Sequence, residues 1–238
     1  MSDALILIIA GFVSGLLSGT VGFGGGMILL PAMTSCFGIE AAVPMSTVSQ
    51  LLSNIFRTTA GFRQVRWKKA GMFLILALPL TIAGAYGFVI VPKEIMTRLL
   101  SVLLILFALL EMSEKFRLPK SRWTMLAGGG VAGAINGLLS LSGPVSSAVF
   151  LTLGLSPIAY IATEAAAATV MHIVQLAAYG EFGLMSWHIV AEGVWAGAAM
   201  MLGNWIAMKR IKTIKRKIYR RTVAVVMIAC SIWLFFSV

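Results

Sequence analysis

The sequence predicts an all-α protein that crosses a membrane several times. Of its 238 residues, 59% are hydrophobic and 11% are charged, and the mean hydropathy is +0.96. Soluble domains carry about 25% charged residues, so this composition excludes that class. The hydrophobic residues also fall into long runs separated by short polar connections. We therefore expect residues 1–238 to form a single transmembrane domain whose function lies within the bilayer.

The length of each hydrophobic run decides whether it can span the membrane. An α-helix rises about 1.5 Å per residue, and the hydrocarbon core is about 30 Å thick. Two runs, 25–38 and 144–155, would cover only about 20 Å and are expected to be broken or re-entrant helices. Asp3 precedes the first run, which lacks the basic start of a signal peptide, so we expect that run to be retained. The runs expected to span, about eight, are 4–21, 42–62, 70–91, 96–113, 123–140, 157–179, 188–208 and 222–238.

The charged connections predict the orientation of the chain. Lys and Arg are concentrated in the connections 63–69, 115–122 and 209–221, which accounts for most of the formal net charge of +11. Connections rich in Lys and Arg are retained in the cytoplasm. The connections 92–95 and 180–187 carry no excess of positive charge and are expected outside. Alternation of the connections then places both termini outside.

The two halves of the chain resemble each other weakly. Residues 11–62 align with residues 129–180, and the glycine and serine positions fall in the same order. A chance match is the alternative, because small residues are common in membrane helices. The aligned motifs are Gly15-Leu-Leu-Ser-Gly19 with Gly133-Ala-Ile-Asn-Gly137, Gly24-Gly25-Gly26 with Ser142-Gly143-Pro144, and Phe37-Gly38-Ile39 with Leu153-Gly154-Leu155.

The charge of the loops indicates that the repeat is inverted. The connection after the first copy, 63–69, is basic, whereas the one after the second copy, 180–187, is acidic. The two copies therefore face opposite sides of the membrane, as in the inverted-topology repeats of transporters. We expect repeats at about 4–113 and 123–238, joined by a cytoplasmic loop at 114–122.

Glycines precede the first short segment and predict a binding site. Gly22, Gly24, Gly25 and Gly26 carry no Cβ, so a ligand could approach the backbone at the start of the helix 27–38. Non-helical backbone at membrane depth is tolerated only inside protein or beside a hydrated cavity. Because a helix N-terminus favours negative charge, we expect this site to bind an anion.

The second short segment offers an equivalent site. Ser140, Ser142, Gly143, Pro144 and Ser146 surround its start, where hydroxyl groups add hydrogen-bonding capacity and proline suits the first helical turn. Close packing of helices through small residues is the alternative explanation for each of these positions.

The run 42–62 places polar side chains on one face. At about 100° per residue, Gln50, Ser53 and Arg57 lie close together, with Asn54 beside them. We expect this face to point into the protein. Arg57 could then be the counter-charge of a bound anion, or it could extend to the nearby cytoplasmic surface; the sequence leaves both open.

The run 157–179 carries the groups that could couple protons. Glu164, His172 and Gln175 share one face of this run. An acidic residue and a histidine within a span are candidates for a proton relay. Structural hydrogen bonding is an equally acceptable role for the histidine.

Several other classes of function are not expected. Nucleic-acid binding would need a basic domain, but the basic residues lie between hydrophobic runs. The only histidines are His172 and His188, and the cysteines, Cys36 and Cys230, lie in apolar runs, so we expect no metal site, cofactor or disulfide framework. Ser142 and His172 could be imagined as a protease pair, yet no motif requires it, and we expect no enzyme activity.

The chain resembles a known transporter family. The motif Gly-Phe-Gly-Gly-Gly-Met-Ile-Leu-Leu-Pro at 22–31 is similar to the signature of the sulfite exporter TauE/SafE family. Ser142 departs from that pattern, in which glycine is usual, and Glu164 stands where similar proteins have a small or hydroxyl residue. The resemblance extends to the turn 61–67, the pair Gly84 and Gly87, the second copy at 142–144 and the segment 203–210.

This resemblance implies a carrier in the bacterial inner membrane for small sulfur-containing anions such as sulfite, sulfoacetate or other organosulfonates. The anion site expected at the helix starts agrees with that substrate class. The hypothesis from the sequence is alternating access, with coupled protons as an open question. A passive anion channel and a membrane-embedded enzyme are the alternatives, and the oligomeric state is not predicted.

Overall fold

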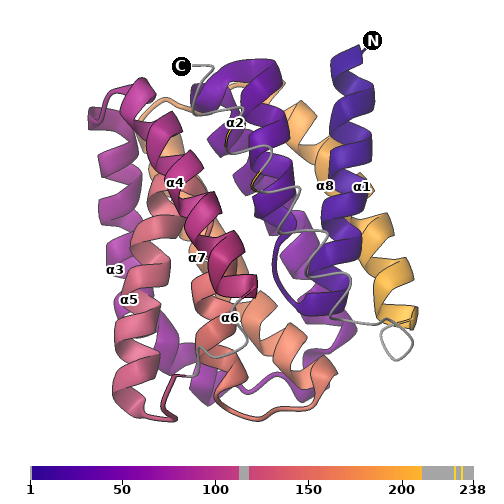
Figure 1. The fold of residues 1–238 in the computed structure, drawn as a ribbon, viewed down its shortest axis with the longest axis vertical. Coiled ribbons are helices and arrows are strands. Elements are labelled where there is room, and N and C mark those ends of the chain that lie inside the picture. The colour runs from indigo at the N-terminus through magenta and orange to yellow at the C-terminus, as the bar shows by residue number, and fades with distance from the viewer. Residues whose placement is uncertain (1, 113–117, 211–227, 229–231, 233–238) are drawn as a thin grey trace.

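The computed structural model describes residues 2–112, 118–210, 228 and 232. Within these residues every regular element is helical, in agreement with the predicted fold class. Figure 1 shows the helices running along the long axis of a bundle. The elements are α1 (Ser2–Val21), α2 (Gly25–Ala60), the 3₁₀ turn η1 (Phe62–Gln64), α3 (Trp67–Ile90), α4 (Lys93–Met112), α5 (Arg122–Leu139), α6 (Gly143–Leu151), α7 (Pro157–Glu181) and α8 (Trp187–Arg210).

The first short segment and the span after it form one element with a break. The predicted runs 25–38 and 42–62 are both part of α2, and Gly38 separates them with φ 73° and ψ 161°. A residue with a Cβ rarely adopts that conformation, which explains the glycine. Helix resumes directly after Gly38, so the predicted connection at 39–41 is helical.

The second short segment is a separate helix and is shorter than predicted. The run 144–155 was expected to be helical throughout, but α6 has 9 residues and ends at Leu151. Gly154 adopts φ 64° in the connection that follows, which turns the chain toward Pro157. The last predicted span, 222–238, lies outside the described residues except for positions 228 and 232, as does part of the predicted loop 114–122.

Four of the described helices are long and apolar enough to cross a membrane: α2, α3, α7 and α8. The other long helices are shorter or more polar; α4 and α5, for example, have 20 and 18 residues and include charged residues. The chain is therefore a multi-pass membrane protein by length and composition, while the count of eight spans stays a prediction.

Two helical hairpins approach each other from opposite ends of the bundle. In the first, α1 leads through the turn Gly22–Gly24 into the first part of α2; in the second, α5 leads through Ser140–Ser142 into α6. Figure 1 places the start of α1 at one end and the connection after α6 at the other. The turns meet, because a Cβ added to Gly143 would lie 3.5 Å from the backbone nitrogen of Gly24.

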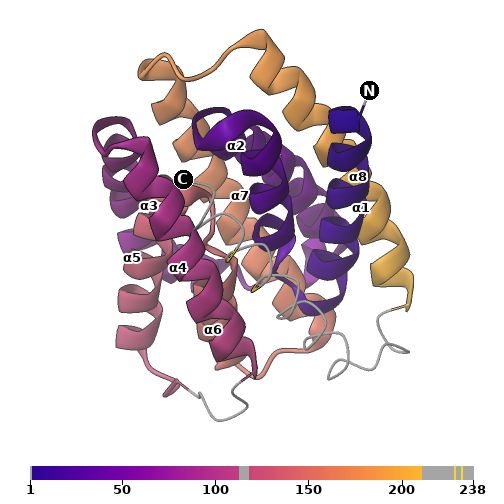
Figure 2. The same cartoon turned by 45° about the horizontal axis from the view of Figure 1, so that its top comes forward.

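The two hairpins are packed in matching ways. A Cβ added to Gly15 of α1 would lie 2.1 Å from the carbonyl oxygen of Met200 in α8. In the same way, a Cβ added to Gly133 of α5 would lie 2.1 Å from the carbonyl oxygen of Ala77 in α3. Figures 1 and 2 both show α1 beside α8 on one flank and α3 beside α5 on the other. Gly15 and Gly133 are aligned in the predicted repeat, so aligned glycines make the close contact in each hairpin; the inverted repeat itself stays a prediction.

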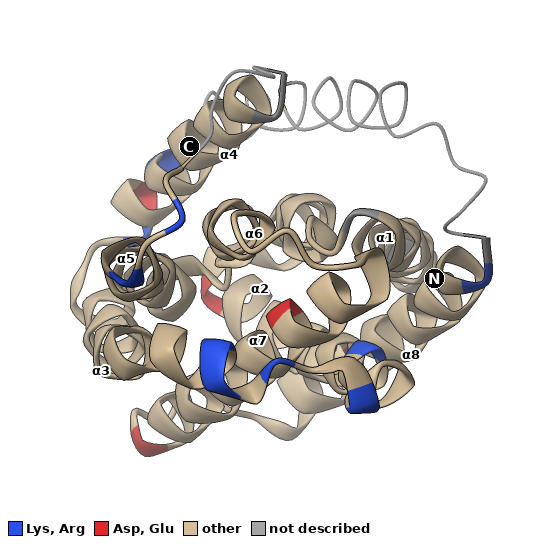
Figure 3. Cartoon of the chain, turned by 90° about the horizontal axis from the view of Figure 1, so that it is seen from below, with Lys and Arg blue, Asp and Glu red and all other residues tan. Residues whose placement is uncertain are grey.

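The described basic residues of the connections gather at one end of the bundle. Arg63 and Arg66 lie in the connection around η1, Arg122 begins α5, and Lys209 lies at the end of α8. Figure 3 views the molecule from this end and shows blue segments around its rim. The distribution is the one that the positive-inside rule associates with the cytoplasmic side.

The close packing of α5 on α3 predicts a steep cost for a single methyl group. Gly133→Ala places a Cβ against the backbone of Ala77, which cannot rotate away, so we expect the free energy of unfolding to fall by about 1–3 kcal/mol or more. Gly71→Ala is the matched control, because nothing lies within 4 Å of its added Cβ, and alanine should stabilise that helix by up to about 1 kcal/mol. Thermal unfolding in detergent measures both; equal midpoints would contradict the packing.

Candidate functional site

A polar cavity lies where the turns of the two hairpins meet. Its volume is about 20 Å³, which is room for about one water molecule. Backbone from 23–27 lines it on one side and from 141–144 on the other. The side chains that complete the lining are those of Ser18, Gln50, Ser53, Asn54, Arg57, Glu164, Ala168, His172 and Met200.

The first turn depends on glycine at two positions. Gly22 and Gly24 have φ values of 89° and 96°, in the left-handed region that favours glycine. A Cβ on Gly22 would also lie 2.5 Å from the ring of Tyr160. Gly26 faces Gln50, whose amide nitrogen would lie 2.8 Å from an added Cβ. These positions bring the start of α2 close to the polar face of its own second part.

Arg57 points into the protein. It lies in the second part of α2 and is only 4% exposed, which decides between the two orientations that the sequence left open. Its Nη1 donates to the carbonyl oxygens of Gly22 at 2.6 Å and Ser18 at 3.3 Å, and its Nη2 donates to Asn54 Oδ1. The Ser18 carbonyl also accepts from the backbone N–H of Gly22 at 3.0 Å, so the guanidinium group adds a second donor there, and at Gly22, where the helix has ended, it supplies a donor to the carbonyl.

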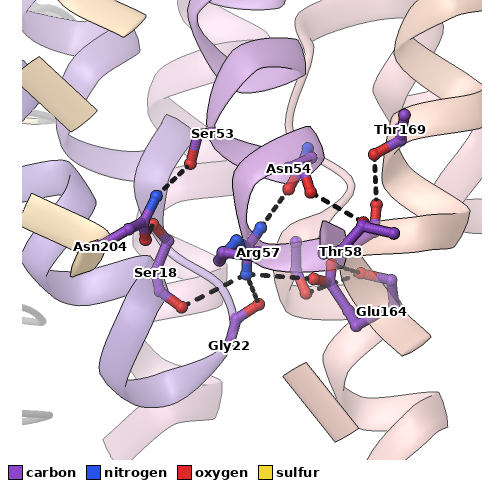
Figure 4. A network of polar contacts seen from close by, with 12 residues as sticks. Ser18, Gly22, Ser53, Asn54, Arg57, Thr58, Glu164, Thr169 and Asn204 are labelled. Atoms are coloured by element: carbon purple, nitrogen blue, oxygen red, sulfur yellow. Dashed lines mark hydrogen bonds and ion pairs between the residues drawn. The ribbon is translucent and has the colours of Figure 1, made fainter. Parts of the chain in front are cut away.

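A buried ion pair joins the two halves of the chain at this point. Arg57 Nη1 lies 3.4 Å from Glu164 Oε2, and the two side chains are 5% and 2% exposed. The other carboxylate oxygen accepts a hydrogen bond from the hydroxyl of Ser146 at 2.8 Å. Figure 4 shows the guanidinium group between the turn at Gly22 and the carboxylate. The cavity therefore has one cation and one anion in its wall.

In the second half of the chain, Gln175 has the role that Arg57 has in the first. Its Nε2 donates to the carbonyl oxygen of Asn136 at 2.7 Å and to the hydroxyl of Ser140 at 3.0 Å. The residues joined are 39 and 35 positions apart, as they are between Arg57 and its acceptors Ser18 and Gly22. A charged side chain thus holds one broken helix end, and a neutral amide holds the other.

Two nitrogen atoms at the cavity have no hydrogen-bond partner among the described residues. They are Nε of Arg57 and Nε2 of His172, both buried and both on side chains that line the cavity. His172 Nδ1 is engaged by Gln175 Oε1 at 3.2 Å. Since Gln175 Oε1 can only accept, Nδ1 of the neutral imidazole donates to it and Nε2 is an unpaired acceptor, whereas Nε of Arg57 is an unpaired donor. A buried polar group without a partner is costly, so both atoms point to a ligand or water in the cavity.

The broken helices and the polar cavity are features of a transporter site, and the comparison with known families agrees. A sequence profile for the sulfite exporter TauE/SafE family matches residues 7–234. The chain belongs to this family. Because TauE/SafE proteins are membrane transporters, the chain is a transporter of the multi-pass membrane class. No curated protein matches it closely enough to add a relative.

In this TauE/SafE family member, the structure brings most of the residues predicted for the site to one cavity. Four predicted residues do not line it. Gly22 and Ser140 instead form the helix ends, Ser146 bonds to Glu164, and Gln175 bonds to the end of α5. Those that line the cavity are Gly24, Gly25, Gly26, Gln50, Asn54, Arg57, Ser142, Gly143, Pro144, Glu164 and His172.

Several residues that line the cavity were not predicted as site residues from the sequence, and two of them lie on helices that the prediction had left out of the site. Ser18 and Met200 line the cavity, on α1 and α8 respectively. Ser18 of α1 donates to Asn204 of α8 at 2.8 Å, and Asn204 donates to Ser53 of α2 at 2.8 Å. These two bonds connect α8 to α1 and to α2. A signal for Ser18 existed in the aligned motifs, where it falls on Asn136.

The ion pair predicts an unequal response to single and double substitution. Arg57→Met should lower the free energy of unfolding by about 3–5 kcal/mol, because it leaves the charge of Glu164 buried without a partner. The double variant Arg57→Met with Glu164→Gln removes the stranded charge, so it should be more stable than the single variant. Thermal unfolding in detergent compares them. If the two substitutions lower the free energy of unfolding additively, so that the double variant is the least stable, the result would contradict a close ion pair.

Proposed function

We propose that the chain is a secondary transporter that moves a small sulfur-containing anion across the inner membrane by alternating access. The cavity between the two hairpin turns is the proposed substrate site. The observation that carries the proposal is the buried and unpartnered donor Nε of Arg57, which lines the cavity at the meeting point of two helix starts.

The chemistry of the cavity suits an oxyanion. The helix starts at Gly25 and Gly143 both border it, and the first N–H groups of a helix have no partners within that helix. Their partial positive charge adds to that of the guanidinium group of Arg57. A sulfite or sulfonate group presents three oxygens as acceptors, so it can take hydrogen bonds from both turns at once. Sulfite, sulfoacetate and other organosulfonates are the proposed substrates.

The cavity is too small for the proposed substrate in the described conformation. A sulfonate group is several times larger than the one water molecule for which there is room. The hairpins must separate before the anion binds, and the side chain of Gln50 lies where they meet. Since the two hairpins enter from opposite ends, movement of each would open the site to a different side. We propose this inverted arrangement as the basis of alternating access.

Binding of a sulfur oxyanion should stabilise the purified protein. A ligand at about a hundred times its dissociation constant stabilises the folded state by about 2.7 kcal/mol. We expect a raised unfolding temperature with at least one of sulfite, thiosulfate, sulfoacetate or methanesulfonate, and none with chloride. Gly25→Val should abolish both this shift and flux into proteoliposomes, because its side chain would enter the site; the nearest obstacle is the flexible end of Met200.

The matched control for this variant is Gly180→Val, since nothing lies within 4 Å of a Cβ at that position. It should keep both the shift and the flux. Transport that survives in Gly25→Val would place the substrate elsewhere. A response to a cation or an uncharged solute alone would overturn the proposed substrate class, and a conductance far above carrier turnover would overturn the carrier mechanism.

We also propose that the basic end of the bundle is cytoplasmic, with both termini outside. Single cysteines, introduced after replacement of Cys36 and Cys230 by alanine, test the orientation. A membrane-impermeant maleimide should label Ser186→Cys in intact cells and Gln64→Cys only after the membrane is opened. Both original residues are exposed, and they lie in connections at opposite ends of the bundle. The reverse pattern of labelling would invert the proposed topology.

A further inference from the structure

We propose that Glu164 is a built-in counter-ion of Arg57 and takes up one proton each time an anion binds, so that this cavity binds an anion and a proton together. The inference rests on the proposed function, because it describes how the same site takes its substrate. It adds the number of protons that bind with each anion and the residue that receives the proton.

The position of Glu164 carries the first step. Its carboxylate oxygen Oε2 lies 3.4 Å from Arg57 Nη1, and both residues line the cavity. A carboxylate and a sulfonate are both anionic oxygen groups that a guanidinium group binds well. Glu164 therefore already provides to Arg57 the interaction that a substrate anion would provide. An arriving anion adds to this carboxylate or displaces it.

The charge count carries the second step. Among the described residues that line the cavity, Arg57 and Glu164 are the two that form an ion pair, and the formal charges of this pair sum to zero. Both are almost completely buried, which makes an uncompensated charge costly. A monovalent anion would leave the site with one excess negative charge. One proton on Glu164 restores the sum to zero, and Arg57 then has the substrate as its only counter-ion.

Few other groups near Glu164 can titrate. The elements packed against α7 are α2, α3, α5, α6 and η1. Arg57 is the charged side chain that α2 directs toward Glu164, and α6 contributes the neutral hydroxyl of Ser146. From α3 and α5 no described residue lines the cavity. On its own helix, His172 lines the cavity and Tyr160 packs against the first turn at Gly22.

The side chains around η1 complete this survey. Arg63 of η1 and Arg66 after it are exposed at the surface of the bundle, and Arg66 contacts α7 through its backbone N–H, which donates to Thr163. Neither shares the cavity with Glu164. His172 is therefore the competing candidate for the proton, and the experiment must separate the two.

The proton has a defined place in the site. Oε1 of Glu164 accepts from Ser146 and Oε2 accepts from Arg57 Nη1. When the anion takes over the guanidinium group, Oε2 is released and becomes the position for the proton. Protonation turns that oxygen from an acceptor into a donor. The carboxyl group could then donate to the bound anion instead of repelling it. Transport of a monovalent anion would move no net charge, because the proton travels with it.

The first experiment measures binding of methanesulfonate to the full chain in lipid nanodiscs. This probe keeps a single negative charge through the neutral pH range, so any change of affinity belongs to the protein. We expect uptake of one proton per bound anion, read from a pH dye in weak buffer. In the alkaline range the affinity should fall about tenfold per pH unit, as linkage to one proton requires. Binding without proton uptake would overturn the proposal.

The variants identify the group that takes the proton. Glu164→Gln imitates the protonated carboxyl, so it should bind methanesulfonate with an affinity that does not depend on pH and should release or take up no proton. His172→Gln is the matched control on the same helix and should retain one proton per anion. If His172→Gln loses the proton uptake and Glu164→Gln keeps it, the assignment to Glu164 is wrong.

Transport gives an independent readout. In proteoliposomes, wild-type protein should accumulate methanesulfonate along a proton gradient, whereas Glu164→Gln should exchange it across the membrane without accumulation. Should Glu164→Gln fail to fold, the wild-type proton count and the His172→Gln variant still decide the question. If no sulfur oxyanion binds the wild type at any pH, the proposed function fails as well; if anions bind without protons, only this inference fails.

Discussion

The structure depends on finding partners for one guanidinium group inside the membrane. Arg57 is almost fully buried, and its Nη1 is shared by two carbonyl oxygens at the end of α1 and by the carboxylate of Glu164. The helix ends before Gly22, and the arginine supplies a donor to the Gly22 carbonyl and a second donor to the Ser18 carbonyl, so the turn and the buried arginine stabilise each other. The glycines at Gly22 and Gly24 permit the turn that brings the carbonyls toward the arginine. The glycine turn thus places backbone acceptors where the buried arginine needs them.

The two halves of the chain meet this requirement with different chemistry. Gln175 satisfies the end of α5 at the same sequence separations as Arg57 does for α1, but it brings no charge. A neutral amide needs no counter-ion, whereas the arginine does, and Glu164 from the second half provides it. The arginine bonds to the end of the first hairpin, whereas its counter-ion Glu164 bonds to Ser146 of the second hairpin. The ion pair therefore links the two hairpins.

Much of the fold could be predicted from the sequence, and parts of the site could not. Hydropathy and helical length located the long helices, and the glycines and Pro144 located both breaks, because these signals are local. Periodicity placed Arg57 on an interior face, but it could not choose between the cavity and the membrane surface, since both orientations start from the same Cα. The pair with Glu164 joins residues 107 positions apart and exists only once α2 packs on α7. Gln175 was grouped with the proton relay because it shares a face with His172; its carbonyl acceptors come from α5, which a helical wheel does not include.

The sharing of Arg57 Nη1 links the conformation of the protein to the charge of the site. Its acceptors are Ser18 and Gly22 on the first hairpin and Glu164 on α7, which packs against the second. When the hairpins separate to admit an anion, the guanidinium group cannot keep all three at their present distances. Water that enters the opened site and the anion can both replace the bond given up, and the charged anion forms the stronger bond to the guanidinium group. The anion therefore stabilises the open site more than water alone does.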